Sequence, residues 1–181
     1  MKRFLQSVAF AAALFAGGPV FAASADPCAA PTPDTPLKGT VSGRVFVPND
    51  VTVYKSKTYG NDGTRYDSYY LTFRDGIGYL QVQTIVKPGS LPDRRTFRRL
   101  PTRDPKQQPM AGPEATEVQS WYLLYPPADI DTGFIRDLAV LRLEFGKRIG
   151  ARLPGHLALC IPRLNAVILG AFDATIQKQE K

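Results

Sequence analysis

The chain contains 181 residues, of which 44% are hydrophobic and 10% aromatic. A chain of this size and apolar content can bury one ordinary core, so the composition excludes a disordered protein. It carries 23 basic and 16 acidic residues, for a net charge of +7. This excess of positive charge favours an anionic partner over a cationic one.

Residues 1–25 have the layout of a secretory signal peptide. Two basic residues open the chain, residues 4–16 are almost wholly apolar, and Gly and Pro then break the run before small residues follow. Cleavage is expected after Ala22 or Ala25. The apolar run is shorter than the roughly 20 residues that span a bilayer, and no later apolar run is as long, so no membrane span is predicted. We therefore expect a periplasmic or secreted protein.

Residues 26–37 follow as a Pro-rich tether in which little regular structure is expected. The tether contains Cys28, and the other cysteine of the chain is Cys160. In an oxidising compartment these two residues are expected to form a disulfide that ties the mature N-terminus to a strand near the C-terminus. We interpret the bond as a structural staple, since the chain has no C-x-x-C redox motif. A metal site built from both cysteines and His156 is the weaker interpretation, and no metal is predicted.

The chain then enters a long β-pattern with short turns. Asp-Gly pairs occur twice between runs of β-branched and aromatic residues, as in tight hairpins. Six of the eight tyrosines fall in this part, which we interpret as strand packing. The expected strands, which together form an antiparallel meander, are 38–47, 51–59, 64–73 and 77–86.

Residues 87–117 interrupt this pattern. They contain six prolines and a run of basic residues, so neither a helix nor a strand is expected there. A loop of this length is uncommon within a domain, and such loops are often functional or disordered.

The β-pattern resumes after this loop. Residues 134–145 fit either a helix or a strand, and the alternation of apolar with charged residues over 138–145 favours a strand. Residues 153–155 (Leu-Pro-Gly) read as a turn. The expected strands in this half are 118–125, 138–145, 156–161 and 166–176.

About eight strands, with turn signals every 8 to 12 residues, are typical of a β-sandwich or a barrel. We therefore predict an all-β fold over residues 38–177. Its form is a single antiparallel β-sandwich, or a partly open barrel, with one long Pro/Arg-rich loop.

Positive charge is concentrated in that loop. Without the signal peptide the chain has 21 basic and 16 acidic residues. Residues 94–106 contain six of the basic residues and one of the acidic residues. The rest of the chain contains 15 basic and 15 acidic residues. Arginine predominates, and its guanidinium makes two-pronged contacts to phosphate and carboxylate groups. The predicted binding residues are Arg94, Arg95, Arg98, Arg99, Arg103 and Lys106. The alternative is a solvated loop whose charges contact nothing specific.

Two stretches bear on catalysis. Asp131-Thr132-Gly133 resembles the core of the aspartic protease motif, although ordinary turn chemistry explains it as well. His156 is the single histidine, so any Ser-His-Asp or Cys-His site would have to use it. The sequence has no phosphate-binding loop, dinucleotide fingerprint or C-x-x-C zinc pair. No catalytic residue and no cofactor is therefore predicted.

Taken together, the sequence predicts a non-enzymatic, exported binding protein of the bacterial envelope. It would contact an anionic envelope component or an acidic protein surface through residues 94–106. One alternative is an inhibitor or immunity-type protein that blocks an envelope enzyme, and another is an unrecognised hydrolase that uses Asp131 or His156. Export argues against a nucleic acid partner, and the sequence does not indicate an oligomeric state.

Overall fold

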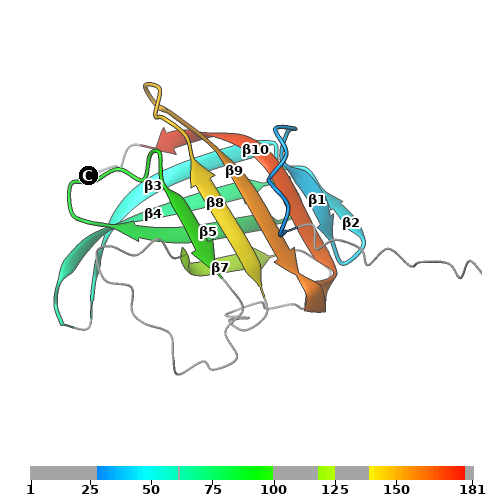
Figure 1. Ribbon diagram of the computed structural model, residues 1–181, viewed down its shortest axis with the longest axis horizontal. Helices are drawn as coiled ribbons and strands as arrows, with labels where there is room; N and C mark the ends of the chain where they lie inside the picture. Colours follow the sequence, from blue (N-terminus) through cyan, green and yellow to red (C-terminus); the bar gives the residue numbers. More distant parts are fainter. Residues whose placement is uncertain (1–27, 61, 100–117, 125–138, 178–181) are drawn as a thin grey trace, which may run out of the picture.

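The computed structural model describes residues 28–60, 62–99, 118–124 and 139–177 (Figure 1). The predicted signal peptide therefore lies outside the described residues. The described chain is nearly all strand. In chain order its elements are β1 (Lys38–Val41), β2 (Arg44–Phe46), β3 (Asp50–Tyr59), β4 (Arg65–Arg74), β5 (Tyr79–Val86), β6 (Thr96–Arg99), β7 (Val118–Leu124), β8 (Val140–Phe145), β9 (Arg152–Ile161), the 3-10 turn η2 (Pro162–Leu164) and β10 (Ala166–Gln177). No helix in these ranges is long and apolar enough to cross a membrane.

The strands form one continuous sheet in the order β6-β8-β9-β10-β3-β4-β5-β7, and β1 and β2 join it as a hairpin beside β10. All pairings between strands are antiparallel except that of β10 with β3. The sheet curls, so that the two strands at the ends of this order, β6 and β7, come into contact (Figure 1). The predicted all-β fold is confirmed, as one large open sheet. The sheet is mostly antiparallel, and the parallel pairing of β10 with β3 departs from the wholly antiparallel arrangement that was predicted.

One hydrophobic core fills the inside of the curled sheet. At its centre four phenylalanine rings meet edge to face: Phe73 contacts Phe172 at 5.2 Å between ring centroids, Phe172 contacts Phe145 at 6.1 Å, and Phe145 contacts Phe97 at 5.9 Å. Each such pair adds about 0.5–1.5 kcal/mol beyond the area that it buries. Because the four rings come from β4, β10, β8 and β6, they join strands that are distant in sequence.

The predicted first strand, 38–47, is in fact a hairpin. Ser42 and Gly43 have φ values of 50° and 79°, the pair of positive φ angles that a two-residue type I′ turn requires. The hairpin pairs with β10 through β1, so it is not part of the predicted meander. The meander of β3, β4 and β5 is confirmed.

The predicted structureless loop 87–117 was wrong at Thr96–Arg99, which form strand β6 beside β8. The reason is Phe97, whose side chain is 1% exposed in the core. Its neighbours Thr96 and Arg98 lie further out, in the alternation of a strand with one buried face. Burial of the Phe97 ring therefore stabilises a strand in this segment despite its charged composition.

The predicted turn at 153–155 was also wrong, because these residues lie within β9. Pro154 has no N–H to give to the ladder, but its carbonyl accepts a hydrogen bond from the Gly146 amide at 2.8 Å. The Gly146 carbonyl in turn accepts one from the Arg94 amide at 3.1 Å. Pro154 therefore still joins the neighbouring segment through its carbonyl, although it lies inside a strand.

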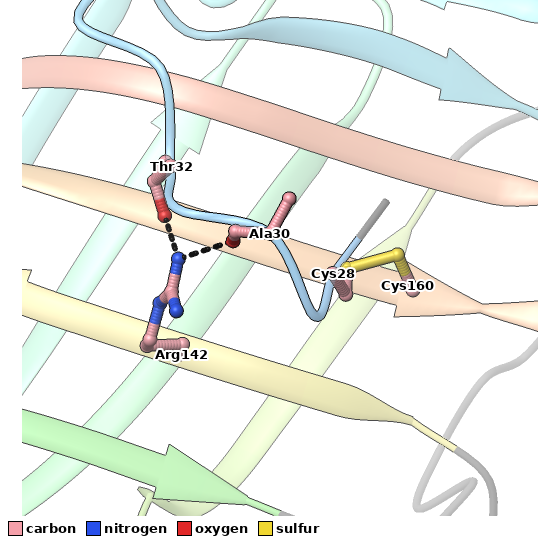
Figure 2. The surroundings of a disulfide bond; sticks show 5 residues. All are labelled: Cys28, Ala30, Thr32, Arg142 and Cys160. Carbon is pink, nitrogen blue, oxygen red and sulfur yellow. Dashed lines mark hydrogen bonds between the residues drawn. A yellow bond between two sulfur atoms is a disulfide. The ribbon is translucent and has the colours of Figure 1, made fainter. Parts of the chain in front are cut away.

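Residues 28–37, here called the N-terminal strap, cross the outer face of β9 and β10 (Figure 2). The predicted disulfide between Cys28 and Cys160 is confirmed and fixes one end of the strap to β9. Arg142 donates hydrogen bonds to the Ala30 carbonyl at 2.8 Å and to Thr32 Oγ1 at 2.7 Å. The other end of the strap pairs with Ala171 of β10 through its backbone. The strap is therefore part of the folded domain, although it contains no strand.

Candidate functional site

Arg94 and Arg95 lie immediately before β6 and both side chains are exposed. Their backbone is held against the end of β8: the Arg94 amide donates to the Gly146 carbonyl at 3.1 Å, and the Phe145 amide donates to the Arg95 carbonyl at 2.9 Å. Arg94 has a φ of 57°, a left-handed conformation that costs an ordinary residue about 1–2 kcal/mol. These hydrogen bonds offset that cost and fix the two arginines on rigid backbone.

Lys147 and Arg148 follow β8 and are also exposed. Because Gly146 is hydrogen-bonded to Arg94, the four basic residues lie on two adjacent segments. We call Arg94, Arg95, Lys147 and Arg148 the basic rim. In the described part of the chain none of the four forms an ion pair with a carboxylate. The basic rim is therefore a local excess of positive charge among the described residues.

The other predicted binding residues are not part of this cluster. Arg98 is exposed further along β6, where its register partner is Arg142 of β8. Arg99 ends β6. Arg103 and Lys106 lie outside the described residues. The structure thus brings two of the predicted residues together with two that the sequence did not single out.

A pocket of about 240 Å³ opens beside the basic rim. Its lining residues come from β3, β4, β9 and β10, from the β8–β9 turn and from the segment after β5. Figure 1 shows that this turn, the end of β10 and the segment after β5 meet at one end of the sheet. Five apolar side chains from four different parts of the chain line it, together with four that carry polar groups. The apolar residues are Val53, Leu91, Pro92, Leu153 and Ile176, and the polar ones are Lys55, Tyr69, Asp93 and Arg148.

Lys55 is held by a buried carboxylate. Its Nζ lies 2.6 Å from Oδ2 of Asp67, whose side chain is 1% exposed, and the Gly89 amide donates to the same oxygen at 2.6 Å. Burial acts to raise the pKa of Asp67, but the hydrogen bonds from Lys55 and Gly89 and the charges of Lys55 and Arg65 outweigh it, so the net effect is a lowered pKa. The hydrogen bond to Asp67 raises the pKa of Lys55. The pair is therefore ionised at neutral pH.

Tyr69 connects this pair to the segment after β5. Its hydroxyl donates to the Ser90 carbonyl at 3.0 Å, and the Lys55 ammonium lies 5.9 Å from the ring centroid, within the range of a cation–π contact. Burial raises the pKa of the Tyr69 hydroxyl, so the group stays a neutral hydrogen-bond donor. Tyr69 and Asp67 together hold residues 89 and 90 at the pocket.

The chain matches no protein-family model, no curated protein and no solved structure.

The residues considered for catalysis do not come together with this pocket. Asp131 lies outside the described residues. His156 lies on the outer face of β9, where its Nε2 is 2.6 Å from Asp34 Oδ1 of the N-terminal strap. Cys160, on the same strand, is bonded to Cys28 and is unavailable as a nucleophile. Within the described ranges, no three His, Cys, Asp or Glu side chains gather as a metal site requires.

The tyrosine-rich strands mainly supply packing. Tyr66 and Tyr69 are buried, while Tyr54 and Tyr70 stack on the outer face with centroids 4.8 Å apart. Gln83 donates a hydrogen bond to the Tyr70 hydroxyl at 3.0 Å. These side chains contact one another across neighbouring strands, which is how a sheet is stabilised.

Proposed function

We propose that this protein is an exported, non-enzymatic binding protein that contacts an anionic component of the bacterial envelope through the basic rim. The observation that carries the proposal is the set of four exposed basic side chains on two hydrogen-bonded segments, none with an acidic partner in the described ranges. The disulfide fits an extracellular or periplasmic location. Phosphate and carboxylate groups of lipids, lipopolysaccharide or wall polymers have the charge that this rim attracts.

The rim is also pre-organised. Arg94 and Arg95 are anchored to the end of β8, and Arg148 Nε donates to the Gly150 carbonyl at 2.7 Å. A partner therefore need not order the backbone that presents these charges, and this lowers the entropy cost of binding. Arginine adds two-pronged contacts to phosphate or carboxylate that lysine cannot make.

The experiment is a titration with inorganic polyphosphate, a probe that has negative charge and no apolar part. One variant replaces all four rim residues with Ser. The control variant makes the same change in net charge at four exposed positions away from the rim. These are Lys38, Arg44, Arg74 and Arg163.

Exposed charge pairs contribute about 0.2–1 kcal/mol each, so loss of four should weaken binding about tenfold or more at 50 mM salt. The control should change affinity by less than about threefold, and raising the salt to 500 mM should weaken the wild type strongly because exposed charges are screened. Equal losses in the two variants would mean that net charge, and not the rim, determines binding, which would refute the proposal. Capture of an envelope enzyme at fixed stoichiometry through high salt would instead favour the inhibitor alternative.

A further inference from the structure

The pocket beside the basic rim has two chemically distinct parts. Val53, Leu153 and Ile176 form apolar walls that continue the core of the curled sheet. Lys55 and Arg148 place cationic groups in the same lining. An apolar pocket with a few charged groups is the usual form of a site for a ligand that is apolar at one end and charged at the other.

The charges that face the pocket determine the sign of the head group. The charge of Lys55 is balanced by Asp67, whereas Arg148 and Asp93 have no ion-pair partner in the described chain. These four groups sum to zero, and the other rim residues, Arg94, Arg95 and Lys147, add three positive charges around them. An anionic head group is therefore favoured, and Arg148 is the lining cation without an ion-pair partner in the described chain that can receive it.

The volume limits the apolar part. About 240 Å³ is below the roughly 300–1,000 Å³ of pockets that hold drug-sized molecules. The pocket therefore has room for part of one hydrocarbon chain and not for the two chains of a bilayer lipid. Leu91 stands in this lining with 39% of its surface exposed, where a substitution can alter the pocket without disturbing the core.

We propose that the pocket binds a free, single-chain anionic amphiphile, with its chain against Val53, Leu153 and Ile176 and its head group beside Arg148 and Lys55. The proposal rests on the proposed function, because the basic rim supplies the attraction for the head group. It goes further by assigning the ligand class and a second, apolar subsite. It predicts that affinity depends on both the charge and the chain of the ligand.

The test compares three probes that share a decyl chain: decyl phosphate, the neutral decyl glucoside and the cationic decyltrimethylammonium, each kept monomeric and titrated by calorimetry. The wild type should bind decyl phosphate at least about tenfold more tightly than either other probe. Asp93→Asn should tighten decyl phosphate binding, because it removes the negative charge from the lining. Similar affinities for the three head groups, or a preference for the cation, would overturn the proposal.

The pocket itself is tested by Leu91→Trp, which places a larger side chain in the lining. We expect it to weaken decyl phosphate binding about tenfold or more and to leave polyphosphate binding unchanged. Ile77→Trp is the matched control, since Ile77 is 62% exposed outside the pocket lining, and it should change neither. If Leu91→Trp leaves decyl phosphate binding intact, the pocket is not the site, whatever the rim variant shows.

A last arm uses phosphatidylglycerol vesicles, in which the chains lie within a bilayer. Because the pocket takes a free amphiphile, Leu91→Trp should leave vesicle binding unchanged. A loss on vesicles as large as that on decyl phosphate would overturn the assignment of a free ligand. Failure of the rim variant to alter polyphosphate binding would refute the proposed function separately, because polyphosphate has no chain to enter the pocket.

Discussion

Replacing Lys55 with Met tests the pair beside the pocket. Met keeps much of the apolar stem that packs near Tyr69 but removes the ammonium group, which lies 2.6 Å from Asp67. The carboxylate would stay buried with one hydrogen bond from Gly89, and with Arg65 no closer than 4.0 Å. The variant should therefore be less stable at neutral pH.

The size of the loss follows from the burial of the two partners. Removing one partner of a fully buried ion pair costs about 3–5 kcal/mol. The side chain of Asp67 is 1% exposed but that of Lys55 is 43% exposed, so water already weakens this pair. We therefore expect Lys55→Met to lower the free energy of unfolding by about 2 kcal/mol at pH 7.

The pH dependence follows from the direction of each shift. Asp67 has a lowered pKa in the folded protein, so its contribution is present above the unfolded pKa of about 3.9 and is lost as the pH falls through the folded value. Lys55 has a raised pKa, so its contribution is present below about 10.4 and is lost as the pH rises through its folded value. The stability difference between the wild type and Lys55→Met should be largest between these limits and should shrink toward pH 2.

The assay is urea unfolding at pH 7 and at pH 2 to 3. Lys55→Met, Asp67→Asn and the variant that carries both substitutions form a double-mutant cycle with the wild type. The double variant should be more stable than Lys55→Met alone at pH 7, because it no longer buries an uncompensated charge. If Lys55→Met costs the same at both pH values, or if Asp67→Asn recovers nothing in its background, lost packing and not lost charge explains the effect.

Two further predictions concern the N-terminal strap. Replacing both Cys28 and Cys160 with Ser opens a link across 132 residues, for which the chain-entropy model gives an upper value of about 5 kcal/mol. Because the strap keeps its other contacts, we expect a loss of about 2–4 kcal/mol in urea unfolding, and a loss below about 1 kcal/mol would contradict a stapling role. Gly170→Ala would place a Cβ 2.6 Å from the Thr35 carbonyl oxygen at a φ of 138° and should cost about 2–3 kcal/mol in thermal unfolding. Gly63→Ala is the control, because Gly63 has a φ of 77° and an added Cβ would have no atom within 4 Å; it should cost only about 1 kcal/mol. If both variants lose the same stability, the strap moves to make room for the added methyl group, which would contradict this prediction.

Local sequence patterns were sufficient for the β3–β4–β5 meander. Each strand carries its own alternation, and the turn after β4 has its own chemistry: the carboxylate of Asp75 accepts hydrogen bonds from the amides of Ile77 and Gly78. Strand register is fixed by such turns together with the buried face. Nothing outside this part of the chain is needed to predict it.

Segments stabilised from a distance were not predicted. Strand β6 depends on the contact of Phe97 with Phe145, and Pro154 is hydrogen-bonded through its carbonyl to the backbone of Gly146. Neither partner can be identified from neighbouring residues. Composition alone therefore predicted a loop at 96–99 and a turn at 153–155, whereas tertiary contacts stabilise strands there.

The residues of the candidate site were likewise predicted only in part. Arg94 and Arg95 stood out as part of a basic run, whereas Lys147 and Arg148 join them only because β6 pairs with β8. A usable signal did exist for Asp67, which shares the parity of Leu71 and Phe73 in β4 and so points a carboxylate toward the core. A charge on the buried face of a predicted strand marks a residue that needs a partner.

The position of β10 bears on the order in which the molecule can assemble. It is the last described strand, yet it joins β9, β1 and β3. The early strands β1 and β3 therefore each keep one unpaired edge until residues 166–177 have been synthesised. Contacts such as Thr40 with Val167 close very long loops before they add stability, and this slows folding. Until β10 arrives, those open edges can pair with another chain, so the yield of folded protein should depend on protection of the newly made polypeptide from its neighbours.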